Sequence, residues 1–427
     1  MSELSYLEKL LDGVEVEWLP LSKVFNLRNG YTPSKTKKEF WANGDIPWFR
    51  MDDIRENGRI LGSSLQKISS CAVKGGKLFP ENSILISTSA TIGEHALITV
   101  PHLANQRFTC LALKESYADC FDIKFLFYYC FSLAEWCRKN TTMSSFASVD
   151  MDGFKKFLIP RPCPDNPEKS LAIQSEIVRI LDTFSALTAE LTAELTAELN
   201  MRKKQYNYYR DQLLSFKEGE VEWKTLGDVT KKWYSGGTPT AGKIEYYENG
   251  NIPWLRTQEV KFSEIDSTEI KITQAALKNS SAKWIPRNCV IIAISGATAG
   301  RSAINKIPLT TNQHCGCLEI DDTKALYRYV FHWVSFNYEN IKSLGQGARG
   351  DLNSTIIKNF KLPIPHASDP QKSLKEQARI VEILDKFDTL TNSITEGLPR
   401  EIELRQKQYE YYRDLLFSFP KPETVSN

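Results

Sequence analysis

The sequence predicts an α+β protein in which two similar mixed α/β domains are separated by two long antiparallel helices, a coiled-coil spacer. The first observation is a repeat, because residues 170–216 and 373–419 align without a gap. The second is that shorter matched segments recur outside these stretches, so the repeat covers the whole chain. The third is a set of short apolar runs that end in Gly-rich turns, as buried strands do. Together they predict approximate internal two-fold symmetry.

The repeated stretches have the pattern of amphipathic helices. No Pro or Gly interrupts residues 170–216, so we expect an unbroken helix of about 65 Å. The second copy contains Gly397 and Pro399, which should kink or break its helix. Two such helices most simply pack on each other, with the domains at opposite ends. The i, i+3, i+4, i+7 face of the first copy consists of Ile177, Ile180, Leu181 and Phe184.

A tandem Thr-Ala-Glu-Leu block occupies residues 188–199. Each four-residue unit adds about 6 Å of rise and turns the helix face by about 40°. Glu198 can pair with Arg202 at i, i+4. Two interpretations stay open: the block is a solvated helix segment without further role, or it is a ruler that sets the distance between the domains.

The matched segments outside the helices divide the chain into four parts: a domain at 1–165, a helix at 166–216, a domain at 217–368, and a helix with its tail at 369–427. Pro-rich stretches mark the joints at 159–167 and 363–370. The matched pairs are 16–18 with 221–223, 30–33 with 236–239, 43–50 with 249–256, 89–93 with 296–300, and 105–106 with 312–313.

The amino-acid composition limits which classes of protein are possible. The 427 residues carry a net charge of +2, so any nucleic-acid-binding surface must be local. No apolar run approaches a membrane span and the N-terminus has no signal-peptide pattern. The nine cysteines suit a reducing compartment, and we expect a cytoplasmic protein. His314-Cys315-Gly316-Cys317 lacks the second ligand pair of a structural zinc site.

Three segments resemble known catalytic motifs, and each lacks residues that the motif requires. Residues 237–243 resemble a phosphate-binding P-loop, but Ile244 stands where Ser or Thr is needed. Asn166-Pro167-Glu168 lacks the second Pro and the aromatic residue of a base-holding methyltransferase loop. Asp52-Asp53 is matched by Glu259-Val260, which keeps one carboxylate of a possible nuclease metal site. The sequence therefore predicts no catalytic and no metal site in this chain.

Binding is the function that the remaining residues support. Amide side chains can read adenine and arginines can read guanine, while Gly-rich turns let backbone approach a ligand. The tryptophans and glycines of the repeat are interpreted as scaffold, and the basic and amide residues as either scaffold or DNA contacts. The predicted DNA-binding residues are Arg28, Tyr31, Lys35, Arg50, Thr91, Gln106 and Arg107 in the first domain, and Arg256, Thr298, Arg301, Gln313 and Arg349 in the second.

A globule-plus-helix repeat with GGTP, NGxIPW, GATAG and NQ segments resembles the specificity subunit of type I restriction–modification systems. The Thr-Ala-Glu-Leu block followed by MRKKQYNYYRDQLLSF is similar to the IC branch of that family. The resemblance implies two target-recognition domains, each reading half of a bipartite DNA site, with the sequence read encoded in 20–155 and 226–358. It implies that the helices bind two methyltransferase subunits, through which restriction subunits join. Catalysis, S-adenosylmethionine, ATP and Mg²⁺ would belong to those partners.

Two other classes compete with this interpretation. One is a stand-alone DNA methyltransferase or nuclease with duplicated domains. The other is a coiled-coil adaptor that contacts only protein. Methyl transfer by the isolated chain would favour the first, and an absence of salt-dependent DNA binding would favour the second.

Overall fold

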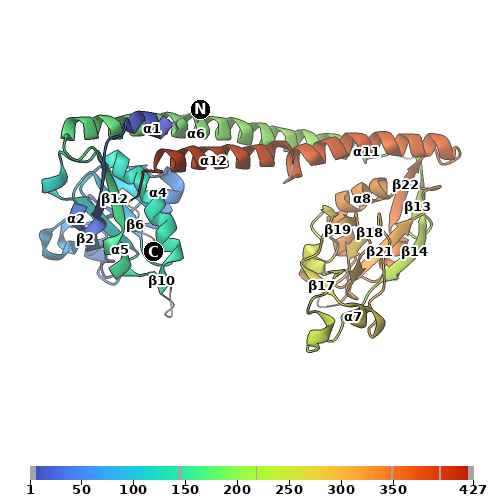
Figure 1. The fold of residues 1–427 in the computed structure, drawn as a ribbon. Helices are drawn as coiled ribbons and strands as arrows, with labels where there is room; N and C mark the ends of the chain where they lie inside the picture. The colour runs from blue at the N-terminus through green and yellow to red at the C-terminus, as the bar shows by residue number, and fades with distance from the viewer. Residues whose placement is uncertain (1–5, 143–146, 218, 348–349, 394–395, 422–427) are drawn as a thin grey trace. The chain divides into compact units, whose positions relative to one another are not determined.

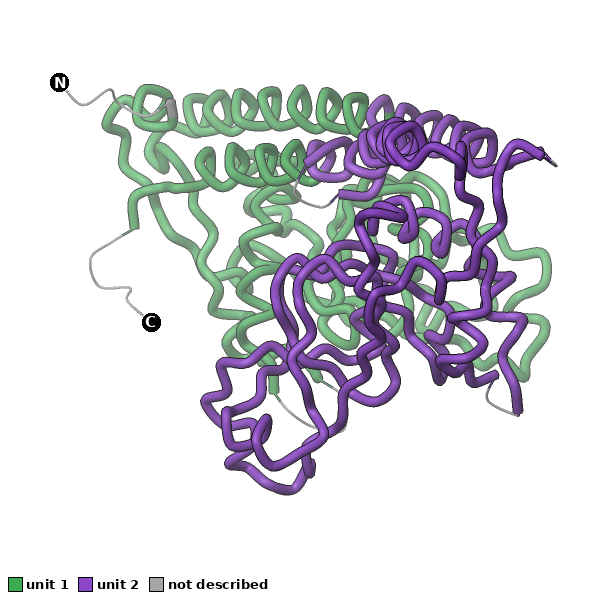
Figure 2. Tube along the Cα trace, turned by 90° about the vertical axis from the view of Figure 1, so that its right-hand side faces the viewer, with its two compact units in different colours: residues 1–193, 403–427 green, residues 194–402 purple. Residues whose placement is uncertain are grey.

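The computed structural model describes residues 6–142, 147–217, 219–347, 350–393 and 396–421. The chain divides into two compact units, residues 1–193 with 403–427, and residues 194–402 (Figure 2). We call the part of the first unit before the long helix α6 (Pro167–Leu213) the first domain, and the part of the second unit between α6 and α11 (Pro370–Asn392) the second domain.

The first domain is built on a five-stranded sheet whose central strand β6 is buried on both faces (Figure 1). Ile84 and Ile86 of β6 pack in the core beneath helix α4, whereas Leu85 packs in a second core that includes a smaller three-stranded sheet. This alternation is the period of two that a strand imposes on its side chains. In sheet order the strands are β2 (Phe25–Asn29), β9 (Phe108–Leu113), β6 (Ser83–Ser87), β7 (His95–Ile98) and β4 (Ile60–Leu61), and then β5 (Lys67–Ile68), β3 (Ile46–Phe49) and β8 (Leu103–Ala104).

Two further strand pairs and five helices complete the described part of the first domain. Helix α4 begins at the N-cap Asp122, whose carboxylate accepts from the Lys124 and Phe125 amides. The elements are the pair β1 (Val16–Pro20) and β12 (Leu158–Pro162), the pair β10 (Thr141–Thr142) and β11 (Ser148–Val149), and helices α1 (Tyr6–Leu11), α2 (Leu21–Val24), α3 (Met51–Asn57), α4 (Ile123–Lys139) and α5 (Met151–Lys156).

The second domain repeats this topology. Val290 and Ile292 of its central strand face one core, and Ile291 and Ala293 face the other. The five-stranded sheet has the order β14 (Thr230–Ser235), β21 (Cys315–Ile320), β18 (Val290–Ala293), β19 (Ser302–Asn305) and β16 (Glu264–Ile265). The three-stranded sheet has the order β17 (Ile270–Ile272), β15 (Ile252–Leu255) and β20 (Thr310–Thr311), and β13 (Val221–Thr225) pairs with β22 (Lys361–Pro365). The α-helices are α7 (Gln274–Lys278), α8 (Tyr327–Phe336), α9 (Tyr338–Ser343) and α10 (Ser354–Asn359).

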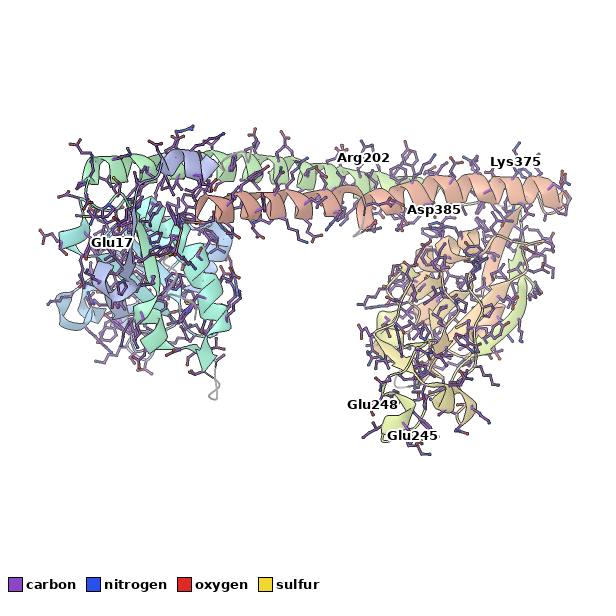
Figure 3. The ribbon with its side chains drawn as sticks, viewed as in Figure 1. Glu17, Arg202, Glu245, Glu248, Lys375 and Asp385 are labelled. Carbon is purple, nitrogen blue, oxygen red and sulfur yellow. The ribbon has the colours of Figure 1, made fainter. Side chains whose placement is uncertain are left out.

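The long helices behave as their sequences predict. Helix α6 runs for 47 residues without a break. Its Arg202, labelled in Figure 3, pairs with Glu198 at 2.6 Å. The second copy is broken between α11 and α12 (Gly397–Leu416), where Gly397 has a φ of +75°. A Cβ at Gly397 would lie 2.5 Å from the Thr389 carbonyl oxygen, so only glycine fits there. The predicted break is confirmed.

Within the first unit, α6 and α12 pack antiparallel. The Phe184 ring lies 5.6 Å from the Tyr412 ring, and the Ser185 hydroxyl donates to the Tyr409 hydroxyl at 3.0 Å. In the second unit the matched contact is a stack between Tyr209 and Phe387, with ring centroids 5.5 Å apart. The predicted helical spacer is therefore present.

Each domain is attached to its helix by the same polar contacts. The buried Gln174 accepts from the Asp122 amide at the start of α4, and the buried Gln377 accepts from the Leu326 amide at the start of α8. Asp182 accepts from Lys124 and Tyr128 at 2.7 and 2.8 Å. Its counterpart Asp385, on the side of α11 that faces α8 in Figure 3, accepts from Arg328 and His332. These contacts explain why glutamine and aspartate recur in both helices.

The segment after α12 completes the first domain. Phe417 and Phe419 are buried in the core of α4, where the Phe417 ring lies 5.4 Å from the Phe125 ring. The Trp18 indole donates to the Pro420 carbonyl at 3.0 Å. Leu214, just after α6, is buried in the core of the second domain in the corresponding way. The end of one long helix thus packs in each domain, in keeping with the internal repeat.

Candidate nucleic-acid interface

Three loops meet at one edge of the small sheet in the first domain. They follow Gly30, strand β3 and strand β8. The Trp48 indole of β3 donates to the Tyr31 carbonyl at 3.0 Å, and the Asn105 amide donates to the Phe49 carbonyl at 3.0 Å. A Cβ at Gly30 would lie 2.2 Å from the Asn105 carbonyl oxygen. The loops approach so closely that a side chain at this position has no room, which explains the repeated glycine.

A buried carboxylate fixes the turn after β3. Asp53 is fully buried, and its two oxygens accept from the amides of Arg50 and Leu65, both at 2.6 Å. Glu259 does the same in the second domain, accepting from the Arg256 and Glu269 amides at 3.0 and 2.8 Å. The acidic residue that a nuclease interpretation would use is therefore part of the scaffold, and it holds the preceding arginine in place.

The loops enclose a cleft of about 790 Å³, which we call the amide cleft. It has five cationic side chains and one carboxylate, that of Asp52, which lies 3.7 Å from the Arg50 guanidinium. Within the described residues the buried Nε of Arg50 has no hydrogen-bond partner. The cleft is thus basic and has donors left over for a ligand. It is lined by Thr32, Lys35, Lys38, Trp41, Ala42, Trp48, Arg50, Met51, Asp52, Arg55, Gln66, Asn105, Gln106 and Arg107.

The same threonine–glutamine pair stands in both domains. The Thr32 hydroxyl donates to Oε1 of Gln106 in the first, and the Thr238 hydroxyl donates to Oε1 of Gln313 at 2.7 Å in the second. Both glutamines are exposed. A carboxamide held in this way keeps a donor and a further lone pair for the N6 and N7 edge of adenine. The pair gives each domain a pre-oriented side chain that can read a base.

The two arginines after β3 and β15 differ in their surroundings. Arg256 donates to Glu269 at 2.5 Å, and its guanidinium also lies 3.8 Å from Glu259. The residue matched to Glu269 in the first domain is Leu65, which cannot pair with Arg50. The two domains therefore combine one scaffold with different polar groups, which is what reading two different half-sites requires.

Two further predicted residues of the first domain, Arg28 and Tyr31, do not line the amide cleft. Arg28 donates to the Leu78 and Lys77 carbonyls, and its guanidinium lies over Phe79. The Tyr31 hydroxyl donates to the Ala72 carbonyl and accepts from the Lys74 amide. These contacts give Arg28 and Tyr31 structural roles, and a DNA contact for either stays a prediction.

Thr91 lines a neighbouring cleft, and Thr298 and Arg301 occupy the matched loop in the second domain. Arg349 lies outside the described residues. The predicted set missed Thr32, Trp41 and Gln66 as lining residues of the amide cleft. The repeat of Thr-Pro at 32–33 and 238–239 was a signal that could have found Thr32.

Among the described residues, no arrangement of side chains supports a function other than binding. Within the described ranges, no group of three His, Cys, Asp or Glu side chains could hold a metal ion. Cys315 and Cys317 are buried in β21, and burial raises the pKa of the Cys315 thiol to about 12, so it is not a nucleophile at neutral pH. Nor is any helix in the described part of the chain long and apolar enough to span a membrane.

Residues 13–201 and 218–404 match the family described as type I restriction modification DNA specificity domain. The chain is 66% identical over 398 residues to the specificity subunit of the Escherichia coli type I restriction enzyme EcoprrI, covering 93% of both chains. It is 46% identical over 451 residues to the Escherichia coli EcoR124I/EcoR124II specificity subunit, covering 100% of both.

Solved structures share the fold. A chain from a study of complex assembly and conformational transition of the type I R-M system has a TM-score of 0.59 at 15% identity, over 94% of this chain and 97% of that chain. The HsdS subunit from Thermoanaerobacter tengcongensis has a TM-score of 0.50 at 14% identity, over 94% of this chain and 95% of that chain.

A duplicated domain, with a basic cleft in its first copy and a helical spacer between the copies, is the architecture of a DNA-recognition subunit. The match over both halves shows that this chain belongs to the type I restriction–modification DNA specificity family. It is a specificity subunit and not an enzyme, and neither competing class is supported. The resemblance predicted from the repeated segments is confirmed.

Proposed function

We propose that each domain reads one half of a bipartite duplex DNA site, with the amide cleft of the first domain and the matched loop of Gln313 in the second contacting base edges. The observation that carries this proposal is the pair Thr32–Gln106, repeated as Thr238–Gln313 on the same scaffold. One pre-oriented amide per domain implies two reading positions on one chain. The differing partners of Arg50 and Arg256 imply that the two half-sites differ in sequence.

The long helices offer a matched surface for partner subunits. An apolar groove of about 440 Å³ lies between α6 and α12 in the first unit, with Phe184 and Tyr412 on its walls. The second unit repeats the aromatic contact as Phe387 and Tyr209. Because the aromatic contact occurs once in each unit, it suits two copies of one partner, which we infer to be methyltransferase subunits that bind S-adenosylmethionine. Restriction subunits using ATP and Mg²⁺ would join through them, in the cytoplasm.

A domain exchange tests the reading proposal. Residues 217–368 are replaced by the equivalent segment of a relative, and methylated sites are mapped in cells that also produce the cognate partners. One half-site should change and the other should stay the same.

Alanine at Arg256, Gln313 or Arg349 should weaken the free energy of DNA binding by about 1–3 kcal/mol, mostly at one base position. If all three variants discriminate like the parent chain, these residues do not read bases.

The isolated chain provides a second test. It should transfer no methyl group from labelled S-adenosylmethionine and should bind its target specifically only with the methyltransferase present. Adenine methylation by the chain alone would contradict this.

A further inference from the structure

A second basic cleft, of about 640 Å³, adjoins the amide cleft in the first domain and shares Arg55 with it. We call it the arginine cleft. Its charged side chains are three arginines and Glu94. It is lined by Ile54, Arg55, Gly58, Arg59, Ala90, Thr91, Ile92, Glu94, Arg138 and Thr141.

Hydrogen-bond donors in this cleft exceed the acceptors available to them. Arg59 pairs with Glu94 at 2.8 Å and donates to the His95 carbonyl at 3.1 Å, so this arginine and the carboxylate neutralise each other. The guanidinium groups of Arg55 and Arg138 make no hydrogen bond or ion pair with any described residue. The Thr91 hydroxyl likewise has no partner in the described part of the chain. Two uncompensated cations and a free hydroxyl favour an anionic ligand.

The second domain repeats the core of this arrangement. Gly93 and Gly300 both have left-handed φ angles, +89° and +86°. A Cβ at Gly93 would lie 2.7 Å from Nη1 of Arg138, and one at Gly300 would lie 3.3 Å from Cβ of Lys342. In both domains the side chain of a basic residue therefore lies against the glycine of the same loop, two residues after Thr91 or Thr298: Arg138 of α4 in the first and Lys342 of α9 in the second. A basic residue beside the same loop in both domains points to a shared role at both half-sites.

The chemistry of the lining separates the two clefts. The free side chains of the arginine cleft can all donate, and its two free guanidinium groups cannot accept, whereas phosphate oxygens are acceptors only. The amide cleft contains carboxamides, which donate and accept as base edges do. Because Arg55 belongs to both clefts, a DNA strand whose bases enter the first would bring its backbone to the second.

We propose that the arginine cleft binds a backbone phosphate of the DNA duplex through Arg138, Arg55 and Thr91, and that Lys342 and Thr298 do the same in the second domain. This inference rests on the proposed function, since it concerns how the same DNA is held. The phosphate contact fixes the register of each domain on the duplex without selecting sequence.

The test compares Arg138→Ala with Lys139→Ala in the full chain assembled with its partner subunits. Lys139, the next residue of α4, is an apt control because it is 71% exposed, pairs with Glu135 and does not line the cleft. Fluorescence anisotropy measures binding to two duplexes, one with the DNA site found by methylation mapping and one with a scrambled sequence. The salt concentration is varied between about 50 and 200 mM. Thermal melting verifies that each variant is folded, and Arg138→Lys keeps the charge in case loss of packing complicates the alanine variant.

Arg138→Ala should weaken binding about tenfold to both duplexes, and the slope of log K against log salt should become less negative by about 1. Arg138→Lys should retain the parent slope, and Lys139→Ala should behave as the parent. Replacing single phosphates by neutral methylphosphonates should reveal one position that weakens the parent complex but has no effect on Arg138→Ala.

Two results would overturn the phosphate proposal: Arg138→Ala indistinguishable from Lys139→Ala, or an altered base preference with an unchanged salt slope. Failure of the parent complex to distinguish its target from the scrambled duplex would instead refute the proposed function.

Discussion

Replacing His102 by leucine should make the first domain less sensitive to acid. His102 is fully buried between the rings of Phe49 and Phe79, whose centroids lie 5.4 and 5.5 Å away. Its Nδ1 lies 2.8 Å from the Val100 carbonyl oxygen, while Nε2 has no partner among the described residues. Protonation would leave a buried N–H without an acceptor. The second domain has Leu309 at the matched position, buried in the same way.

The expected magnitude follows from two histidines. Burial lowers the pKa of His102 from 6.5 to about 4, and burial followed by the charge of Arg59 lowers that of His95 to about 3. Below pH 6.5 the unfolded chain therefore binds protons at these histidines, whereas the folded chain does not. The contribution of the neutral histidines to the unfolding free energy is complete above pH 6.5 and falls toward pH 4. At pH 5 each histidine should cost roughly 2 kcal/mol, at about 1.4 kcal/mol per pH unit.

Hydrogen exchange followed by mass spectrometry can report each domain separately. Peptides covering β6 measure opening of the first domain, and peptides covering β18 measure opening of the second. Between pH 7.5 and pH 5 the parent should lose about 4 kcal/mol of opening free energy at β6, and His102→Leu about 2 kcal/mol. The reciprocal variant Leu309→His should make β18 acid-sensitive.

Equal acid losses at β6 in the parent and in His102→Leu would refute this reasoning. That result would mean that His102 accepts a proton in the folded domain, through an opening or an acceptor that its buried position does not provide. A uniform change at β6 and β18 would point instead to an effect on the whole chain.

Three further predictions concern the spacer, the reading arginine and the scaffold. Deleting Thr192–Leu195 shortens α6 by about 6 Å, which corresponds to one to about two base pairs at about 3.4 Å per step. Methylome sequencing should therefore find the same half-sites with a DNA spacer that is shorter by this amount, and unchanged spacing would refute the ruler interpretation. Glu269→Leu, which copies the first domain, removes the closer of the two carboxylates paired with Arg256 and should alter base preference only in the second half-site, by about 1–3 kcal/mol, as binding to single-base target variants would show. Asp53→Ala leaves the amides of Arg50 and Leu65 without their buried acceptor and should lower the unfolding free energy by about 2–4 kcal/mol, whereas Asp52→Ala should change it little in urea titrations.

The spacer was predictable because helices are specified by local pattern. The i, i+3, i+4, i+7 face marks α6, and Ile177 and Leu181 of that face are buried in the first domain. Gly397 is equally informative, since its freedom of φ is a local property that ends a helix wherever it occurs. The repeat added the domain order, because a segment that recurs along the chain must recur in the fold.

The composition of the clefts was not predictable in the same way. Arg28 and Arg50 are both basic residues at strand ends, yet one is held by backbone carbonyls and the other lines the amide cleft. Asp53 reads as a candidate acid and is in fact buried against two amides. Thr91 and Arg138 lie far apart in sequence and meet only through the packing of α4 on the sheet. Sequence by itself therefore determined the duplicated architecture and the family, while the tertiary structure alone decided which side chains remain free to bind, because that depends on contacts between distant segments.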